Sequence, residues 1–300
     1  MRRRLFYCDH HQIELPKAHK FPMAKYHMLR QALQRDGLYA FEPAPLATRE
    51  DIEQVHDAAY VEAFLGGTLP PQAMRRIGFP WSQSLVQRTL CSVGGTLAAT
   101  SGALESGYGA VLAGGTHHAF RGEGAGYCVF NDIAVAARWL LTHRGLERIA
   151  VVDCDVHQGD GTAQIFADEA RVFTLSLHGR RNFPFRKQQS TLDVELEDAT
   201  GDDEYLAALE TALGKVLQWK PQALFFQSGV DGLACDRLGR LSLTHEGLRR
   251  RDQMVLSACR ENEIPVVVTL GGGYGEPLDA TAEAHANTYR SALVIFGKER

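Results

Sequence analysis

The sequence predicts an α/β protein of three layers, in which helices cover both faces of a mostly parallel central sheet. The first supporting observation is the alternation of short apolar segments with longer segments of helical periodicity. The second is that the apolar segments are nearly continuous, as in strands that are buried on both faces. The expected strands are residues 5–8, 110–115, 149–152, 172–177, 223–228 and 264–270.

Helices are expected between these strands. They comprise residues 23–36, 51–65, 84–106, 133–143, 202–218 and 244–262. Gly37 is a typical stop for the first helix, and Asn131 and Asp132 are able to cap the fourth. Within the long third helix, Gly94 and Gly95 indicate close packing against a neighbour.

Residues 69–83 hold three prolines and a glycine, so we expect them to be irregular. Connections of this length are often functional, and we therefore expect this segment to line the mouth of a site. The chain shows no internal repeat, low-complexity segment or linker. A single domain over residues 1–300 is the resulting expectation.

Composition limits the classes of partner. The 300 residues are 45% hydrophobic, with a net charge of −4 and a pI near 6.3. This balance allows a large core and gives no general attraction to nucleic acid or to anionic membranes. A basic protein or a polyamine, if it is the substrate, would have to be met by local acidic groups.

The compartment is also indicated by the sequence. No run of about eighteen apolar residues is available for a membrane helix, and the apolar segment after the N-terminal arginines is too short for export. The six cysteines show neither CxxC spacing nor a dense framework. We therefore expect reduced thiols and a cytoplasmic protein.

The strongest chemical signal lies at the end of the strand at 149–152. The apolar run is followed at once by Asp153, Asp155, His157 and Asp160. Three carboxylates within eight residues repel one another unless a positive charge lies among them. A metal ion is the natural candidate.

Polar residues also follow three other expected strands. His117 and His118 follow the strand at 110, Asp231 follows the strand at 223, and Tyr274 follows the last strand after three glycines. Because the carboxyl ends of neighbouring parallel strands meet at one edge of a sheet, we expect these groups to converge on one pocket. For any one of them taken alone, a capped or salt-bridged surface residue is the ordinary alternative.

Asp155 and His157 are two residues apart, so on an extended backbone their side chains project to the same side. Asp231 would be a third ligand and would complete a mixed site of imidazole and carboxylates with open positions. Zn²⁺ is the first candidate for this site and Fe²⁺ the second.

The adjacent histidines are weaker evidence by themselves, since such pairs are often incidental. Asp153 and Asp160 add weight, because a carboxylate bound to a ring N–H fixes the tautomer and raises the basicity of a histidine. The hydroxyl of Tyr274 is able to donate to an oxyanion beside a metal. A phosphate loop is the alternative for the preceding glycines, but no Lys-Ser/Thr follows and the chain has no GxGxxG, so no nucleotide site is expected.

At this point the sequence resembles the zinc-dependent histone deacetylase family, within the arginase/deacetylase superfamily, over most of its length. Four ordered motifs carry the resemblance: THHAFRGEGAGYCVFND, DCDVHQGDGT, SGVDGLACDRLG and GGGY. The segments HKFPMAKY and GFPWSQSLVQR, together with Gln158, are more similar to the bacterial and class IV branch than to class I. The resemblance implies a central sheet of about eight strands.

The resemblance also implies an activity, the metal-dependent hydrolysis of an N-acyl amide, most simply acetyl, on a lysine or a small amine. The three ligands above would hold the zinc, and His117 and His118 would pair with Asp153 and Asp160 respectively. His118 would act first as general base and then as general acid, and His117 would act chiefly through its charge. Tyr274 would polarise the amide carbonyl together with the metal.

Further positions follow from the same resemblance. Gly126, Tyr127 and Phe183 match residues that line a narrow acyl-lysine channel, and a phenylalanine is usual at position 127. A structural monovalent cation, usually potassium, would lie behind the site. Its ligands would be the Ser176 hydroxyl and the backbone oxygens of Asp153, Asp155, His157 and Leu177.

Two features depart from the family pattern. Lys25 stands where many relatives have an arginine at the floor of the inner cavity. Residues 66–84 hold no clear counterpart of the class I aspartate that binds the substrate backbone.

Two other functions are open on this scaffold. A ureohydrolase with two manganese ions would need carboxylates where this chain has Gly159 and Leu233, so a single metal is expected. The second is a non-catalytic protein that binds acyl-lysine or a small ligand. The presence of every catalytic residue type speaks against it.

Overall fold

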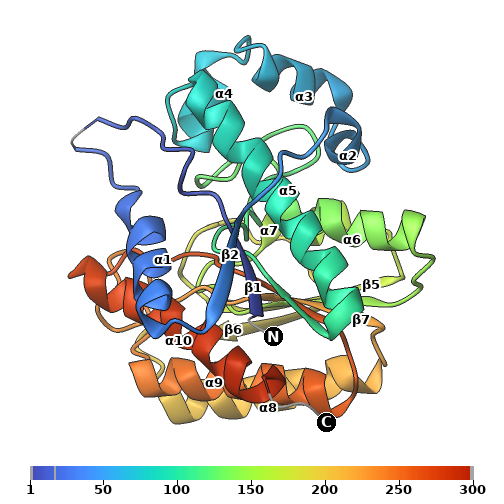
Figure 1. The fold of residues 1–300 in the computed structure, drawn as a ribbon, viewed down its shortest axis with the longest axis vertical. Helices are drawn as coiled ribbons and strands as arrows, with labels where there is room; N and C mark the ends of the chain where they lie inside the picture. The colour runs from blue at the N-terminus through green and yellow to red at the C-terminus, as the bar shows by residue number, and fades with distance from the viewer. Residues whose placement is uncertain (1–2, 17, 298–300) are drawn as a thin grey trace.

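The computed structural model describes residues 3–16 and 18–297 and has three layers (Figure 1). The strands are β1 (Arg3–Tyr7), β2 (Tyr39–Pro43), β3 (Tyr108–Ala110), β4 (Ile149–Asp153), β5 (Val172–Gly179), β6 (Leu192–Leu196), β7 (Ala223–Gln227) and β8 (Val266–Thr269). The helices are α1 (Ala24–Asp36), α2 (Arg49–Glu53), α3 (Ala58–Leu65), α4 (Pro71–Ile77), α5 (Gln83–Ser106), α6 (Asp132–His143), α7 (Asp160–Ile165), α8 (Asp202–Gln218), α9 (His245–Glu261) and α10 (Leu278–Phe296). No helix within the described ranges combines the length and apolarity that a membrane span requires.

Six strands form the central sheet in the order β3-β8-β7-β4-β5-β6, and each neighbouring pair is parallel. Strands β1 and β2 form a separate parallel pair. The predicted number of about eight strands in one sheet is therefore too high for the described part of the chain. The physical reason is that β1 meets the central sheet only through an isolated bridge between Phe6 and Val111, just beyond the three-residue edge strand β3.

Successive residues of the central strands face two different hydrophobic cores. In β4, Ile149 and Val151 belong to one core and Ala150 and Val152 to the other, because strand side chains alternate in direction. The first core is closed by α2 to α7 and the second by α1, α8, α9 and α10, on opposite sides of the sheet in Figure 1. The prediction of a three-layer α/β fold with a parallel sheet is confirmed.

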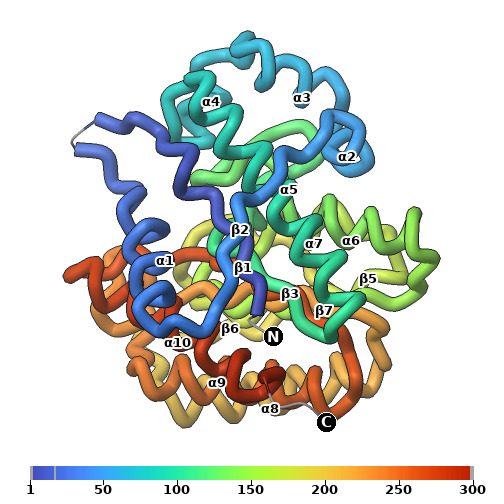
Figure 2. Tube along the Cα trace, in the orientation of Figure 1, coloured from blue at the N-terminus to red at the C-terminus, as the bar shows by residue number. Residues whose placement is uncertain are grey.

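Helices from the two ends of the chain lie side by side on the second face. Figure 2 shows α1 next to α10, and an ion pair of 2.9 Å joins Arg290 Nε of α10 to Asp36 Oδ2 of α1. Helix α1 ends at Gly37, whose φ of 68° is the left-handed conformation typical of a helix stop. This packing holds in place the helix that carries the buried Lys25.

The helix predicted over residues 51–65 is interrupted between α2 and α3. At the interruption, the Asp57 N–H donates to the Arg121 carbonyl at 2.9 Å. The His56 ring donates through Nδ1 to the Phe120 carbonyl, also at 2.9 Å. The backbone breaks here because these bonds attach it to the loop that follows β3.

Other segments also differ from expectation. No element was predicted at β2, β6, α7 or α10. Residues 69–83 contain helix α4, with Pro71 in its first turn and Gly78 in the left-handed conformation at its end. These residue types punctuate helices as readily as loops, so the prediction of an irregular segment was wrong for residues 71–77. The strand expected at 110–115 ends early, at residue 110.

Helix α5 packs closely against its neighbours at Gly94 and Gly95, as predicted from these two glycines. A Cβ atom at Gly94 would lie 2.1 Å from the carbonyl oxygen of Pro45, a backbone atom that cannot rotate away. Gly102, two turns further along the same helix, faces no atom within 4 Å. A Cβ atom at Gly95 would also be crowded, at 2.8 Å from Val111 Cγ2. The packing of α5 therefore requires glycine at its two central positions and not at Gly102.

We predict opposite effects for alanine at Gly94 and at Gly102. Gly94→Ala should lower the free energy of unfolding by about 1–3 kcal/mol, because the backbone must shift to relieve the contact. Gly102→Ala should raise it by up to about 1 kcal/mol, because alanine is the better helix former. Urea denaturation of both variants checks this, and equal effects would contradict the packing described.

Candidate active site

The four strand ends identified in the sequence meet at one edge of the sheet. Strands β3, β8, β7 and β4 are consecutive neighbours, and Asp153 at the end of β4 lies level with Gln227 of β7. Residues from these ends line a small inner cavity of about 50 Å³, among them His117, His118, Asp155, His157, Gly272 and Tyr274. The structure thus brings together the groups that the sequence placed after separate strands.

Asp155, His157 and Asp231 form a compact buried cluster. Their potential ligand atoms all lie within 4.8 Å of one another. His157 Nδ1 is 3.0 Å from Asp155 Oδ1 and 3.0 Å from Asp231 Oδ2. Two backbone N–H groups orient the carboxylates, since Val156 N donates to Asp231 Oδ1 and Gly272 N donates to Asp155 Oδ2.

The electrostatics of this cluster favour bound positive charge. Burial by itself lowers the pKa of His157, but its hydrogen bonds to the two carboxylates outweigh burial and raise the pKa to about 10. Burial and the neighbouring Asp155 raise the pKa of Asp231 to about 7. One nitrogen and two carboxylates, gathered this closely and shielded from water, are a donor set that fits a divalent cation such as Zn²⁺ or Fe²⁺.

Each of the adjacent histidines faces a different carboxylate. His117 Nδ1 lies 2.7 Å from Asp153 Oδ2, and His118 Nδ1 lies 2.6 Å from Asp160 Oδ1. The two rings are 4.0 Å apart between centroids, and all four side chains are buried. When Nδ1–H donates to the carboxylate, Nε2 of each ring is left as the basic nitrogen.

The two histidines differ in charge preference although they are neighbours. Burial lowers the pKa of His117, but Asp153 and Asp155 reverse this effect and raise it to about 9. Burial, and then the charge of His117, lower the pKa of His118 to about 4 in spite of Asp160. At neutral pH the site therefore holds one cationic imidazole beside one neutral imidazole that is able to accept a proton.

Tyr274 is held over the same cavity by its backbone. Its N–H donates to Asp236 Oδ2 at 2.6 Å, and its carbonyl accepts from Arg237 Nε at 3.0 Å. Burial and the nearby carboxylate of Asp155 raise the pKa of the Tyr274 phenol well above its usual value. The hydroxyl thus stays protonated and is available as a hydrogen-bond donor.

An outer cavity of about 480 Å³ leads from solvent to His118, His157 and Tyr274. Gly126, Tyr127 and Phe183, the expected channel residues, all line it. The Phe183 ring lies edge-on to the His118 ring at 4.9 Å between centroids. A Cβ at Gly126 would lie 2.7 Å from Cδ2 of His118, so this side chain must be absent for the histidine to keep its place.

The segment 69–83 contributes to the same cavity, as the sequence predicted. Arg75, Arg76, Ile77 and Gly78, from the end of α4, line its outer part. The segment reaches the mouth of the site as a helix end and not as a loop.

Lys25 lies at the inner cavity, where its Nζ is 3.3 Å from the carbonyl oxygens of Gly271 and Gly273. The same nitrogen lies 5.2 Å from the centroid of the Tyr274 ring. Lys25 therefore supports the glycine turn that carries the tyrosine, in addition to bordering the cavity.

Of the residues expected to bind a structural cation, Ser176 and Leu177 lie on β5, beside the end of β4. Ser176 of β5 is the parallel partner of Asp153, and Ser176 and Leu177 are both buried. The Ser176 hydroxyl is within 2.9 Å of His178 Nδ1.

Sequence reasoning missed the part that Asp132 plays at the site. Asn131 and Asp132 were both expected to be able to cap helix α6, and Asn131 does so, accepting from Ala134 N at 2.9 Å. The buried Asp132 carboxylate instead accepts from Gly115 N at 3.0 Å and from Thr116 N at 2.7 Å. The Thr96 and Thr116 hydroxyls donate to it as well. The adjacency of Asp132 to the motif was the available signal, but its partners lie in a different strand end.

We predict that Asp132→Asn destabilises the loop that carries His117. An amide group supplies one acceptor where the carboxylate supplies two, so at least one buried donor loses its partner, at about 1–3 kcal/mol. Urea denaturation should show this loss of stability. An activity assay should show a lower turnover rate. Asp168→Asn, on an exposed residue, is the matched control and should behave as wild type. Wild-type stability in Asp132→Asn would contradict the role described.

Comparison with known proteins shows that the chain is similar to the members of one family. The model of the histone deacetylase domain matches residues 19–291. An uncharacterized protein of Picosynechococcus sp. is 46% identical, and the match covers 94% of this chain and 95% of that protein. A histone deacetylase-like amidohydrolase of Pseudomonas aeruginosa is 32% identical over 83% of this chain and 70% of its own length. Histone deacetylase 2 of Arabidopsis thaliana is 29% identical over 87% and 70% respectively.

Proposed function

This chain belongs to the histone deacetylase family, and we propose that it is a zinc-dependent deacetylase that hydrolyses an N-acetyl or other N-acyl amide on a lysine or a small amine. One observation carries the proposal. Two histidines that each pair with a buried carboxylate, two of the three cluster residues and a buried tyrosine line the inner cavity, and His118, His157 and Tyr274 also line the outer cavity. The residues of each group are His117 with Asp153, His118 with Asp160, then Asp155, His157 and Asp231, and finally Tyr274.

Asp155, His157 and Asp231 would hold the zinc, which when bound polarises the amide carbonyl and lowers the pKa of a water molecule. Fe²⁺ is the second metal that this donor set suits. We propose in addition that K⁺ binds behind the cluster, on the Ser176 hydroxyl and backbone oxygens. Its other ligands would be the carbonyls of Asp153, Asp155, His157 and Leu177.

The protein's own groups have separate tasks in this proposal. His118 takes the proton from the attacking water through Nε2, since its low pKa keeps it neutral before the reaction. It then gives the proton to the departing amine. His117 stays cationic and stabilises the negative charge that develops next to it.

Tyr274 completes the set, because its protonated hydroxyl donates to the oxyanion. Gly126, Tyr127 and Phe183 enclose the alkyl stem of the acylated amine and exclude bulk water. We also place the protein in the reducing cytoplasm, because all six cysteines are free thiols, five of them buried.

The proposal is tested by acetate release from acetyl-lysine peptides and acetylated polyamines. With Zn²⁺ supplied, we expect release that a chelator abolishes. Tyr274→Phe should lower kcat by about 10²–10³-fold and His118→Ala by about 10²–10⁴-fold, with the fold kept. Tyr108→Phe is the control, because that hydroxyl is buried without a hydrogen-bond partner in the described structure and lies far from the strand ends that form the site. Near-normal turnover in the first two variants would reject their roles, and no release from any acylated amine would favour a binding protein.

The rim of the outer cavity indicates a substrate class. Four arginines line it, and no carboxylate of the described residues does: Arg75, Arg76, Arg181 and Arg240. Two carboxylates nearby offset part of this charge, since Arg76 pairs with Glu123, and Arg181 and Arg240 both pair with Asp198. Arg75 is exposed and has no ion-pair partner within the described ranges. A polyamine or a basic peptide would therefore meet like charge at the entrance, and an acyl-lysine flanked by acidic residues would meet attraction.

We predict that kcat/KM is higher for an acetyl-lysine peptide with flanking aspartates than for the same peptide with flanking arginines. Salt should reduce the difference, because the groups are exposed. Arg75→Ala should lower kcat/KM for the acidic peptide by about two- to fivefold and leave a neutral peptide unchanged. Arg35→Ala, an exposed arginine of α1 away from the cavity, is the control. A preference for the basic peptide would overturn this substrate assignment while leaving the reaction itself intact.

A further inference from the structure

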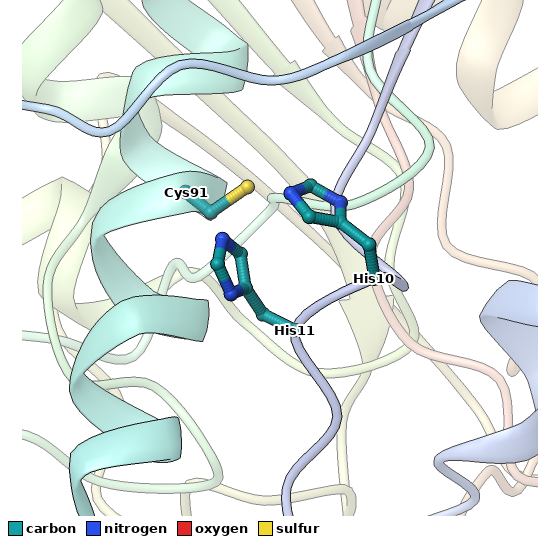
Figure 3. Close-up of side chains that lie close together, drawn as sticks. All are labelled: His10, His11 and Cys91. Atoms are coloured by element: carbon teal, nitrogen blue, oxygen red, sulfur yellow. The ribbon is translucent and has the colours of Figure 1, made fainter.

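A second cluster of metal-binding side chains lies outside the catalytic cavity. The chain that follows β1 runs against α5 and brings His10 and His11 next to Cys91 (Figure 3). Their potential ligand atoms all lie within 4.8 Å of one another. Figure 3 shows one ring nitrogen of each histidine turned toward the Cys91 sulfur. None of the three residues lines either cavity of the catalytic site.

Contacts independent of a ligand hold the backbone of this loop against the helix. The Cys8 thiol donates to the Cys91 carbonyl at 3.3 Å, which ties the loop to the helix. The His11 N–H donates to the Cys8 carbonyl at 3.1 Å and closes a tight turn. The Tyr7 ring lies edge-on to His10 at 5.3 Å between centroids, and the rings of His10 and His11 are 4.2 Å apart. The loop thus places both imidazoles next to Cys91.

Two imidazole nitrogens and one sulfur are a donor set that is characteristic of sites for Zn²⁺ and related cations. Imidazole and thiolate together suit Zn²⁺ and related borderline-soft cations, whereas Mg²⁺ and Ca²⁺ require oxygen donors. Three protein ligands leave a fourth tetrahedral position for water or another small ligand. Solvent exposure decreases from His10, which is exposed, to Cys91, which is buried. An ion could therefore enter from the side of His10.

Neighbouring charges are compatible with a cation. Arg88 and Arg30 are the nearby positive groups. The Arg88 guanidinium lies over the Tyr26 ring at 4.2 Å, and Arg30 is paired with Asp9. Asp9 lies next to His10, accepts from Arg30 Nε at 2.9 Å and contributes a negative charge. Its Oδ1 atom is buried and has no hydrogen-bond partner within the described part of the chain.

Neutral imidazole and thiolate are the forms that bind a metal. The Cys91 thiol donates to the Ala44 carbonyl at 3.4 Å, so metal binding would release this proton and replace that hydrogen bond.

We propose that His10, His11 and Cys91 form a second metal site of Zn²⁺ type, distinct from the catalytic one. A bound ion would join the loop after β1 to helix α5. The same loop leads into α1, which carries Lys25 to the inner cavity. The site would thereby stabilise the connection between the N-terminal segment and the wall of the active site.

Co²⁺ substitution distinguishes the two sites. Co²⁺ bound to a thiolate gives an intense near-ultraviolet charge-transfer band, and the catalytic donor set of Asp155, His157 and Asp231 has no sulfur. The metal-stripped full-length protein should therefore show this band on titration with Co²⁺. Asp231→Ala, which disables the catalytic cluster, should keep the band, and Cys91→Ala should lose both the band and one equivalent of bound metal.

Further variants test whether the two histidines bind the metal at this site. His10→Ala alters an exposed side chain, so it should fold normally and bind Co²⁺ at least tenfold more weakly at this site. Cys259→Ala, on another fully buried cysteine, is the matched control and should keep the band. Circular dichroism establishes that each variant is folded. No band in the wild type at saturating Co²⁺ overturns the proposal, and so does a band of unchanged affinity in both His10→Ala and His11→Ala.

Discussion

The structure depends on keeping several carboxylates close together at a buried edge of the sheet. Asp153, Asp155 and Asp231 lie at or just beyond the ends of two neighbouring strands and are almost fully removed from water. Their mutual repulsion in such surroundings is strong, so the fold has to supply compensating positive charge and hydrogen-bond donors. It does so with His117 and His157, with backbone N–H groups and with the capacity to bind a cation. The reactive character of the site is thus a consequence of this compensation.

Carboxylates that accept hydrogen bonds from backbone N–H groups also occur in the loops that complete the site. Asp132 gathers the N–H groups of Gly115 and Thr116, and so fixes the turn that leads to His117. Asp236 accepts from Tyr274 N and also from Gly239 N, which joins the tyrosine to the loop after β7. Both connections are therefore held by a buried or half-buried carboxylate that accepts hydrogen bonds from backbone N–H groups. Catalytic side chains are positioned through their main chain, which leaves their reacting atoms free.

Local pattern predicted five of the six central strands that the structure describes, most of the long helices and the groups at the strand ends, because each of these depends on consecutive residues. It did not predict strand β6 or helix α10. It failed where distant contacts decide the structure. The helix predicted over 51–65 breaks because Asp57 and His56 bond a loop some sixty residues away. Asp132 looked like a helix cap because its true partners precede it in another strand end. His10 and Cys91 are eighty-one residues apart, so no spacing rule could have joined them.

Buried and exposed residues of the cavity have different roles in the proposed function. In the proposed mechanism the buried groups determine which bond is attacked, and they are held by hydrogen bonds. The rim arginines are exposed and come from α4 and from the loops after β5 and β7. Because exposed charges act over a Debye length and not through precise contacts, the proposed substrate preference would rest on the net charge of the substrate. A common deacetylase core is therefore compatible with a substrate preference particular to this chain.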